Sequence, residues 1–278
     1  MKLTNKHNLP GPLVNAVKGF EKAYKDGRGN TSISVTELIS PPLIKKLKEE
    51  YNDRLEEDVS ERIWSLFGSA VHSVLEHAGG AADLTEERLF LDVEGIRISG
   101  QADLYEESGT LSDYKITSVW SVIGDKIKPE WVTQLNILAL LYENTGFPVT
   151  KLQIVAILRD WSKGKAMAGG NYPECNVKVV DIPRWTKEAT LAYIIERVKL
   201  HAAEPTECTP EEKWAKPPVY AVMKEGRKSA IKLYDTLEEA EADGRGDRVE
   251  VRPGENVRCK EYCPVKDFCP YYKESSDA

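Results

Sequence analysis

Residues 100–115 read GQADLYEESGTLSDYK, and this stretch decides how the middle of the chain folds. Apolar and polar residues alternate along it and Ser108–Gly109 marks a turn, which predicts two short antiparallel strands. Asp103 falls on the first strand. Asp113 and Lys115 share one face of the second, because residues two apart on a strand point the same way. Buried charges of this kind are costly unless something pairs them.

A divalent cation is one group that would pair these charges. Asp103 and Asp113 would repel each other, and one would take up a proton unless a cation came between them. Mg²⁺ and Mn²⁺ are hard ions that prefer oxygen ligands. Lys115 would then orient or deprotonate a water, or stabilise charge that develops at phosphorus. The alternative is a surface ion pair between Asp113 and Lys115. The apolar and hydroxyl residues of TLSDYKIT favour the metal hypothesis.

A histidine upstream offers a further ligand. In GSAVHSVLEH, His72 and Glu76 are four residues apart and share a helix face. A neutral imidazole nitrogen binds metals, whereas a lone histidine is otherwise a satisfied core residue. Glu86 or Glu87, just before the strand RLFLD, would add a carboxylate, although such a charge run is usually solvated.

The hydrophobic pattern predicts a mixed α/β protein in which helices flank a central sheet. Helices are expected at 11–27, from Ser34 with a break at Pro41–Pro42, and at 59–78, 129–146 and 186–204. Three antiparallel strands are expected between Glu86 and Thr117, followed by strands near 149–161 and 176–183. We divide the chain into a helical N-terminal cap (1–58), a core (59–205) and a C-terminal segment (206–278) with a hairpin around Gly226.

Composition restricts the classes of protein to consider. The chain has 278 residues, 41% of them hydrophobic, which suffices for one or two domains. Its net charge of −7 argues against a basic coat protein for nucleic acid, but not against an enzyme that acts on one. No apolar run reaches the ~18 residues of a membrane span, and the N-terminus lacks a signal sequence. We therefore expect a cytoplasmic protein.

Four of the five cysteines predict a metal or cluster site. Cys259, Cys263 and Cys269 lie close together, and Cys208 leads into the same C-terminal segment, whereas Cys175 precedes a strand. Four thiolates suit tetrahedral Zn²⁺ or an iron–sulfur cluster. The spacings are looser than the paired Cys-x2-Cys of structural zinc. Burial as small hydrophobes is disfavoured by the neighbouring Lys, Glu and Pro.

The ordered set of motifs resembles the RecB-like branch of the PD-(D/E)XK nuclease superfamily. That branch has Gly-x3-His on a helix, Gly-x2-Asp on a strand, (Asp/Glu)-x-Lys on the next, and then a helix with Gln. The corresponding residues here, within residues 60–160, are Gly68–His72, Gly100–Asp103, Asp113–Lys115 and Gln134. The branch often has Tyr four residues after the Gln, where this chain has Leu138.

The resemblance implies a fold, a site and a cofactor. The core would be restriction-endonuclease-like. His72, Asp103, Asp113 and the Tyr114 carbonyl would bind Mg²⁺ or Mn²⁺, Lys115 would assist the attacking water, and Gln134 would support catalysis. In helicase-nucleases and CRISPR-adaptation nucleases of this branch, one distant cysteine and three C-terminal ones hold a 4Fe–4S cluster. That favours 4Fe–4S over Zn²⁺ at Cys208, Cys259, Cys263 and Cys269. In those relatives the distant cysteine precedes the core, whereas Cys208 follows it.

The expected function is hydrolysis of phosphodiester bonds at DNA ends. The chain has no GxxxxGK[ST] motif, so we expect a stand-alone nuclease rather than part of a motor. It resembles phage exonucleases of recombination and repair, which would act in the bacterial host cytoplasm, 5′→3′, and supply a single-strand annealing protein. The alternatives are a structure-specific or RNA-acting nuclease, and a non-catalytic protein that binds DNA or a partner.

Two groups of residues are candidates for DNA contacts. Lys224, Arg227 and Lys228 surround the turn KEGRK, where they would contact phosphates if they are not simply solvated. Trp120 and Trp131 flank the acidic motif in sequence, and they either stack on bases or pack in the core.

Overall fold

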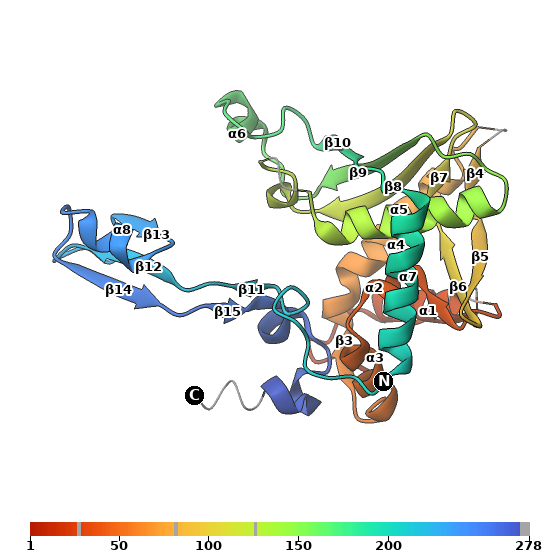
Figure 1. Ribbon diagram of the computed structural model, residues 1–278, viewed down its shortest axis with the longest axis horizontal. Coiled ribbons are helices and arrows are strands. Elements are labelled where there is room, and N and C mark those ends of the chain that lie inside the picture. The colour runs from red at the N-terminus through yellow and green to blue at the C-terminus, as the bar shows by residue number, and fades with distance from the viewer. Residues whose placement is uncertain (27–28, 81–82, 125–126, 273–278) are drawn as a thin grey trace. The chain divides into compact units, whose positions relative to one another are not determined.

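The computed structural model describes residues 1–26, 29–80, 83–124 and 127–272 (Figure 1). The chain forms two compact units. The first contains residues 1–42 and 56–204, and the second contains residues 43–55 and 205–278. Residues 1–42, which the sequence placed in an N-terminal cap, thus belong to the unit that contains the sheet, and residues 43–55 belong to the other unit.

A mixed five-stranded sheet lies at the centre of the first unit. Its order is β10-β9-β8-β7-β4, formed by Val177–Ile182, Lys151–Leu158, Thr110–Thr117, Leu104–Tyr105 and Leu84–Thr85. β8 and β9 are parallel, with Asp113 opposite Ile154, whereas the other pairs are antiparallel. A parallel pair needs a crossover between its strands, which the helix α5 (Pro129–Asn144) provides. The predicted mixed α/β fold with flanking helices is confirmed.

The expectation of three antiparallel strands between Glu86 and Thr117 was wrong. The segment forms four strands in two sheets. β6 (Ile96–Gln101) pairs with β5 (Arg88–Val93) on one edge and with β2 (Ile33–Ser34) on the other, whereas β7 and β8 belong to the five-stranded sheet. Asp103 consequently lies at a bend between β6 and β7 and not on a strand. The chain leaves one sheet and enters the other at this point, which ends the ladder of β6. The turn predicted at Ser108–Gly109 is present, a second turn at Glu94–Gly95 joins β5 to β6, and both glycines have positive φ.

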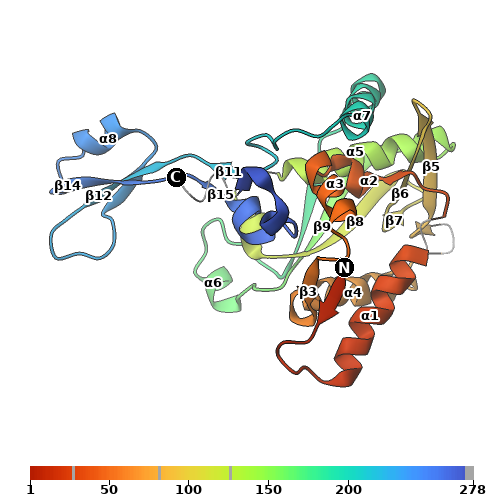
Figure 2. The same ribbon diagram turned by 90° about the horizontal axis from the view of Figure 1, so that it is seen from below.

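Helices cover both sides of the strands β8 and β9: α5 lies on one side and α4 on the other (Figure 2). The predicted helices of this unit are confirmed, although Gly27 of the first lies outside the described residues. Ser34 forms a capping box with Glu37 at the start of α2, and Thr186 caps α7. The α-helices are α1 (Gly11–Asp26), α2 (Val35–Ile39), α4 (Ile63–Glu76), α5, α6 (Lys163–Met167) and α7 (Lys187–Ala202). Short 3-10 turns occur at Val59–Arg62 and Val119–Ser121, and β1 (Lys2–Thr4) pairs in parallel with β3 (Glu56–Asp58).

The second unit contains most of α3 (Pro42–Glu50) and a series of short strands. The predicted hairpin around Gly226 is present as β12 and β13, with β14 on the other edge of β12. Tyr51 stacks on Phe268, with ring centroids 4.6 Å apart, and thereby joins residues 43–55 to the C-terminal turns. The elements are β11 (Ala215–Lys216), β12 (Val219–Met223), β13 (Lys232–Tyr234), α8 (Leu237–Ala242), β14 (Arg248–Arg252), β15 (Glu255–Asn256), a π-turn at Arg258–Tyr262 and a 3-10 turn at Lys266–Phe268.

None of the helices in the described residues combines the length and the apolar character that crossing a bilayer requires.

The packing around residue 100 explains why this position, three residues before Asp103, is a glycine. A Cβ atom at Gly100 would come within 2.5 Å of the Leu138 side chain on α5 and within 2.7 Å of Val35 on α2. These distances are too short for carbon atoms, so β6 can approach the helices this closely only without a side chain. The close approach brings the bend at Asp103 towards α5.

Replacement of Gly100 by alanine tests this packing. We expect Gly100→Ala to destabilise the protein by about 1–3 kcal/mol, as overpacking commonly does. Gly68→Ala is the matched control, because a Cβ there meets nothing within 4 Å. In a helix interior that change should stabilise by about 0.5–1 kcal/mol. Thermal and urea unfolding measure both effects, and equal stability of the two variants would contradict the packing described.

Candidate metal centre

The polar side chains of the predicted metal site line one cavity of about 760 Å³ in the first unit. α4 contributes His72, the bend after β6 contributes Asp103, and α5 contributes Gln134. Asp113 and Lys115 come from the same face of β8, as the period of two in a strand predicts. Segments far apart in sequence thus supply one site, and the parallel β8–α5–β9 unit fixes their relative positions.

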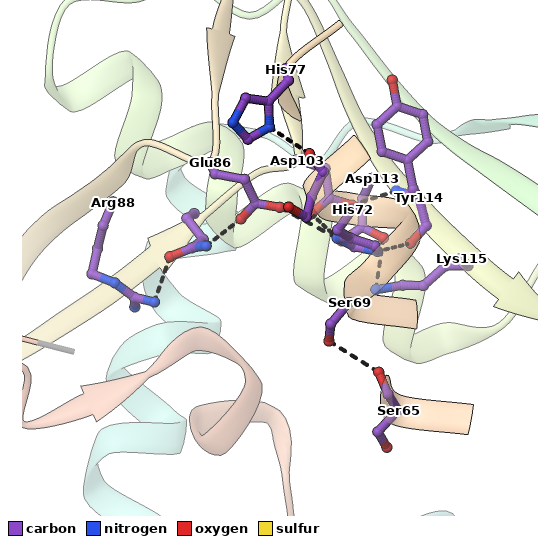
Figure 3. Close-up of polar contacts among 12 residues, drawn as sticks. Ser65, Ser69, His72, His77, Glu86, Arg88, Asp103, Asp113, Tyr114 and Lys115 are labelled. Carbon is purple, nitrogen blue, oxygen red and sulfur yellow. Dashed lines mark hydrogen bonds and ion pairs between the residues drawn. The ribbon is translucent and has the colours of Figure 1, made fainter. Parts of the chain in front are cut away.

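His72 lies at the centre of the closest group of ligand atoms (Figure 3). Its Nδ1 is 3.1 Å from Asp103 Oδ1 and 3.3 Å from Glu86 Oε1. Its Nε2 is 3.1 Å from the carbonyl oxygen of Tyr114. Among the residues that the structure describes, His72, Glu86 and Asp103 form the only group of three His, Cys, Asp or Glu side chains whose ligand atoms lie within 4.8 Å of one another.

Glu86 is held in place from two directions. Its backbone has a φ of 51°, in the left-handed region that is costly for residues other than glycine. Its carboxylate also accepts a hydrogen bond from the Gln101 amide, whose oxygen in turn accepts one from Arg88 Nη2 at 2.5 Å. A residue kept in a strained conformation and fixed by such a chain of bonds is typical of functional sites. The sequence left Glu86 and Glu87 as alternatives, and only Glu86 faces the group, since Glu87 is exposed.

Asp113 is bound by two of the predicted residues. Its Oδ2 is 2.7 Å from Lys115 Nζ, and its Oδ1 accepts a hydrogen bond of 3.0 Å from Gln134 Nε2. Asp113 is buried. The backbone N–H of Tyr114 donates a bond of 2.5 Å to Asp103 Oδ2, which ties the bend after β6 to β8. The two aspartates therefore lie next to each other, each with its own partners.

The proximity of the charges shifts the ionisation of the group. Hydrogen bonds to Asp103 and then Glu86 raise the pKa of His72 to about 10. Burial, together with the negative charge of Asp113, raises the pKa of Asp103 to about 6, against the bonds from His72. Burial would also raise the pKa of Glu86, but the hydrogen bonds from His72 and Gln101 outweigh it, and the pKa is lowered. The imidazolium of His72 thus compensates two carboxylates in a cavity with a surplus of negative charge.

These donors fit a hard divalent cation. Two or three carboxylates, a backbone carbonyl and one imidazole nitrogen are the ligands that Mg²⁺ and Mn²⁺ accept. A bound cation would replace the imidazolium of His72 as the compensating charge, and His72 would then bind it as the neutral imidazole. His72, Glu86 and Asp103 would hold the ion, with Asp113 and the Tyr114 carbonyl as further ligands on the same side of the cavity.

Other candidate residues lie elsewhere. Trp131 is in the core, with 6% of its surface exposed, whereas Trp120 is 71% exposed. Leu138 lines the cavity where the branch often has Tyr, and the nearby Tyr142 is fully buried. Lys224, Arg227 and Lys228 are exposed residues of the second unit, and the cavity of the first unit contains none of them. Sequence reasoning missed Arg88 and Gln101, because their role depends on a pairing of β5 with β6 that places them opposite each other.

A small cavity in the second unit is lined by four of the five cysteines: Cys208, Cys259, Cys263 and Cys269. Leu43, Ile44 and Leu47 of α3 form its apolar side. Burial raises the pKa of Cys208 to about 12 and raises that of Cys259 and Cys263. Cys175 is exposed in the first unit. Cys208, and not Cys175, thus lines the same cavity as the C-terminal cysteines; that these four residues hold a cofactor stays a prediction.

Comparisons with known proteins do not assign a family. No family model matches the chain, and no curated protein sequence is significantly similar to it. A solved structure described as "Crystal structure of SSO0001" superposes with a TM-score of 0.48 and 20% sequence identity, over 69% of this chain and 87% of that chain. The likeness is too low to carry an argument about function, so the proposals below depend on the site itself.

The role of Glu86 can be separated from that of its neighbour. Glu86→Gln should weaken Mn²⁺ binding by about 10–100-fold, the range found when groups that support a metal site are removed. Glu87→Gln removes the same charge from the neighbouring residue, which is exposed, and should leave the affinity unchanged. Titration of the protein with MnCl₂, followed by calorimetry or by electron paramagnetic resonance of free Mn²⁺, measures both. Equal affinities in the two variants would exclude Glu86 from the site.

Proposed function

We propose that the protein is a metal-dependent deoxyribonuclease that hydrolyses phosphodiester bonds at DNA ends. The observation that carries this proposal is the convergence of His72, Asp103, Asp113, Lys115 and Gln134 on one cavity, from four elements far apart in sequence. These are the residues on which the resemblance to the RecB-like PD-(D/E)XK nucleases rests. Glu86 enlarges the acidic set, which gives the cavity the capacity for a divalent cation.

Each residue of the cavity has a definable task. A bound divalent cation supplies a Lewis acid for the phosphoryl oxygens and lowers the pKa of water. Lys115, as the ammonium partner of Asp113, can donate hydrogen bonds to the attacking water and to a phosphate oxygen. Gln134 fixes the orientation of Asp113 through its amide, so we regard it as a positioning residue. His72, Asp103 and Glu86 would each supply one ligand atom to the cation.

The choice of an exonuclease with 5′→3′ polarity, acting in recombination or repair beside an annealing protein, depends on analogy with the phage enzymes. A structure-specific endonuclease and an RNA-acting nuclease would use the same residues. A non-catalytic binding protein would have no need of the Lys115 ammonium 2.7 Å from the carboxylate of the buried Asp113. We therefore favour an enzyme.

Removal of Asp113 tests the proposal. Asp113→Ala should abolish Mn²⁺-dependent and Mg²⁺-dependent cleavage, because both Lys115 and Gln134 lose their partner. DNA binding in the absence of the metal should remain measurable. The assay is digestion of end-labelled linear duplex with each end blocked in turn, with closed circular DNA and labelled RNA as further substrates.

The substrates distinguish the alternatives. Loss of cleavage when the 5′ ends are blocked supports 5′→3′ digestion, and cleavage of closed circles would replace the exonuclease with an endonuclease. Cleavage by Asp113→Ala at the rate of the unaltered protein would reject the site.

We further propose that Cys208, Cys259, Cys263 and Cys269 hold a 4Fe–4S cluster. The distances between the sulfurs support the cluster over Zn²⁺. All four thiols line one cavity, and no three of their sulfurs, all of which lie in the described residues, are within 4.8 Å of one another. Tetrahedral Zn–S bonds of about 2.3 Å would place the sulfurs about 3.8 Å apart. A cluster of four irons is larger and keeps its ligands further apart.

Colour and iron content test the cluster. Protein purified without oxygen should be brown, with absorption at roughly 400 nm from the cluster. Cys263→Ser should lose iron and this absorption, whereas Cys175→Ser, outside the cavity, should keep both. A colourless protein that carries stoichiometric zinc would replace the cluster with a zinc site.

A further inference from the structure

The N-terminal half of α4 exposes two large aromatic rings. None of the 14 residues of this helix is buried, and 55% of the surface of Trp64 and 48% of that of Phe67 are exposed. Single exposed apolar side chains are common, but these two rings contact each other edge to face, with centroids 6.3 Å apart. The pair forms an exposed aromatic surface that nothing in the interior of the first unit requires.

This aromatic surface continues into the metal cavity. Ser65, Gly68, Ser69 and His72 of the same helix line that cavity. Trp64 and His72 are eight residues apart, so at 1.5 Å per residue they lie about 12 Å apart along the helix axis. Gly68 lies between them in sequence and lines the cavity, and a Cβ there would meet nothing within 4 Å, so the helix surface at this position is open. A chain a few nucleotides long could therefore contact the rings and the cavity together.

Positive charge accompanies the rings. The guanidinium of Arg159, which follows β9, lies 4.5 Å from the centre of the Trp64 ring. Lys128 is exposed as a residue and adds a second cation. Partial desolvation of its ammonium, together with the positive charges of Arg159 and Lys115, lowers its pKa, against the charge of Glu130. A cation next to exposed aromatic rings, on a helix that also lines an acidic cavity, matches a ligand with an anionic backbone and flat rings.

We propose that Trp64, Phe67 and Arg159 form a stacking platform for the bases and phosphates of a single DNA strand that enters the cavity. The inference deepens the proposed function, since the strand on the platform would be the substrate of the site. Aromatic side chains stack on any base, and each stacked base contributes about 1–3 kcal/mol. Arginine beside a ring adds a phosphate contact and a cation–π contribution. The platform selects unpaired strands because paired bases have no free faces.

The experiment measures binding of a fluorescein-labelled 12-nucleotide oligo(dT) to the full chain in EDTA, where no metal supports cleavage. Trp64→Ala combined with Phe67→Ala should weaken binding at least tenfold. A tenfold loss of affinity corresponds to about 1.4 kcal/mol, which lies within the about 1–3 kcal/mol that one stacked base contributes. Trp64→Phe, which keeps a ring, should retain most of the affinity. Val74→Ala is the control, since Val74 is 69% exposed on the same helix but outside the platform.

Three further measurements separate base stacking, the phosphate contact and the preference for unpaired strands. An abasic oligonucleotide of the same length should bind the unaltered protein as weakly as oligo(dT) binds the double variant. Arg159→Gln should reduce the slope of log affinity against log salt by about 0.7, the value for one phosphate contact of a single strand. A 12-base-pair duplex should bind more weakly than oligo(dT).

These experiments distinguish failure of the platform from failure of the nuclease proposal. If the double variant binds oligo(dT) as tightly as the unaltered protein, the platform is overturned, whether or not the protein cleaves DNA. Loss of self-association in that variant, with unchanged oligonucleotide binding, would assign the rings to an interface between copies and also overturn it. If binding falls as expected but Asp113→Ala still cleaves, the platform stands and the metal site does not.

Discussion

The hydrogen bond from the Tyr114 backbone N–H to Asp103 is the interaction on which the site depends. It joins the end of one sheet to the central strand of another, at the bend where the chain passes between them. The bend lets Asp103 face His72 on α4. Asp113 directly precedes Tyr114 on β8, so the same hydrogen bond also fixes Asp103 beside Asp113. Asp103 and Asp113, which repel each other, thus line the same cavity.

Compensation of this charge determines the rest of the arrangement. Without a cation, the imidazolium of His72 balances Asp103 and Glu86, and the ammonium of Lys115 balances Asp113. Gln134 and Gln101 donate to carboxylate oxygens of Asp113 and Glu86, and Arg88 in turn donates to the amide oxygen of Gln101. Such a network is costly to bury and would be replaced by apolar residues if it served stability alone. Its retention at the wall of a large open cavity is consistent with a functional site.

The sequence predicted those parts of the fold and the site that local patterns control. The helices followed from their periodicity and caps, and Asp113 and Lys115 followed from the two-residue period of a strand. The break between β6 and β7 could not be predicted, because alternation of apolar and polar residues continues through Ala102 and Asp103 while the strands change partners. Glu86 could not be distinguished from Glu87, since its choice depends on a left-handed backbone conformation and on Gln101. The exposure of Trp64 and Phe67 could not be predicted, because burial of a helix face depends on which elements pack against it.

Anomalous diffraction from a crystal soaked in Mn²⁺ tests the central claim most directly. The account predicts a manganese peak in the cavity of the first unit, bound by the imidazole of His72 and by carboxylate oxygens of Asp103 and at least one of Glu86 and Asp113. A peak only at other positions, with His72 still bonded to Asp103 and Glu86 at saturating Mn²⁺, would contradict it.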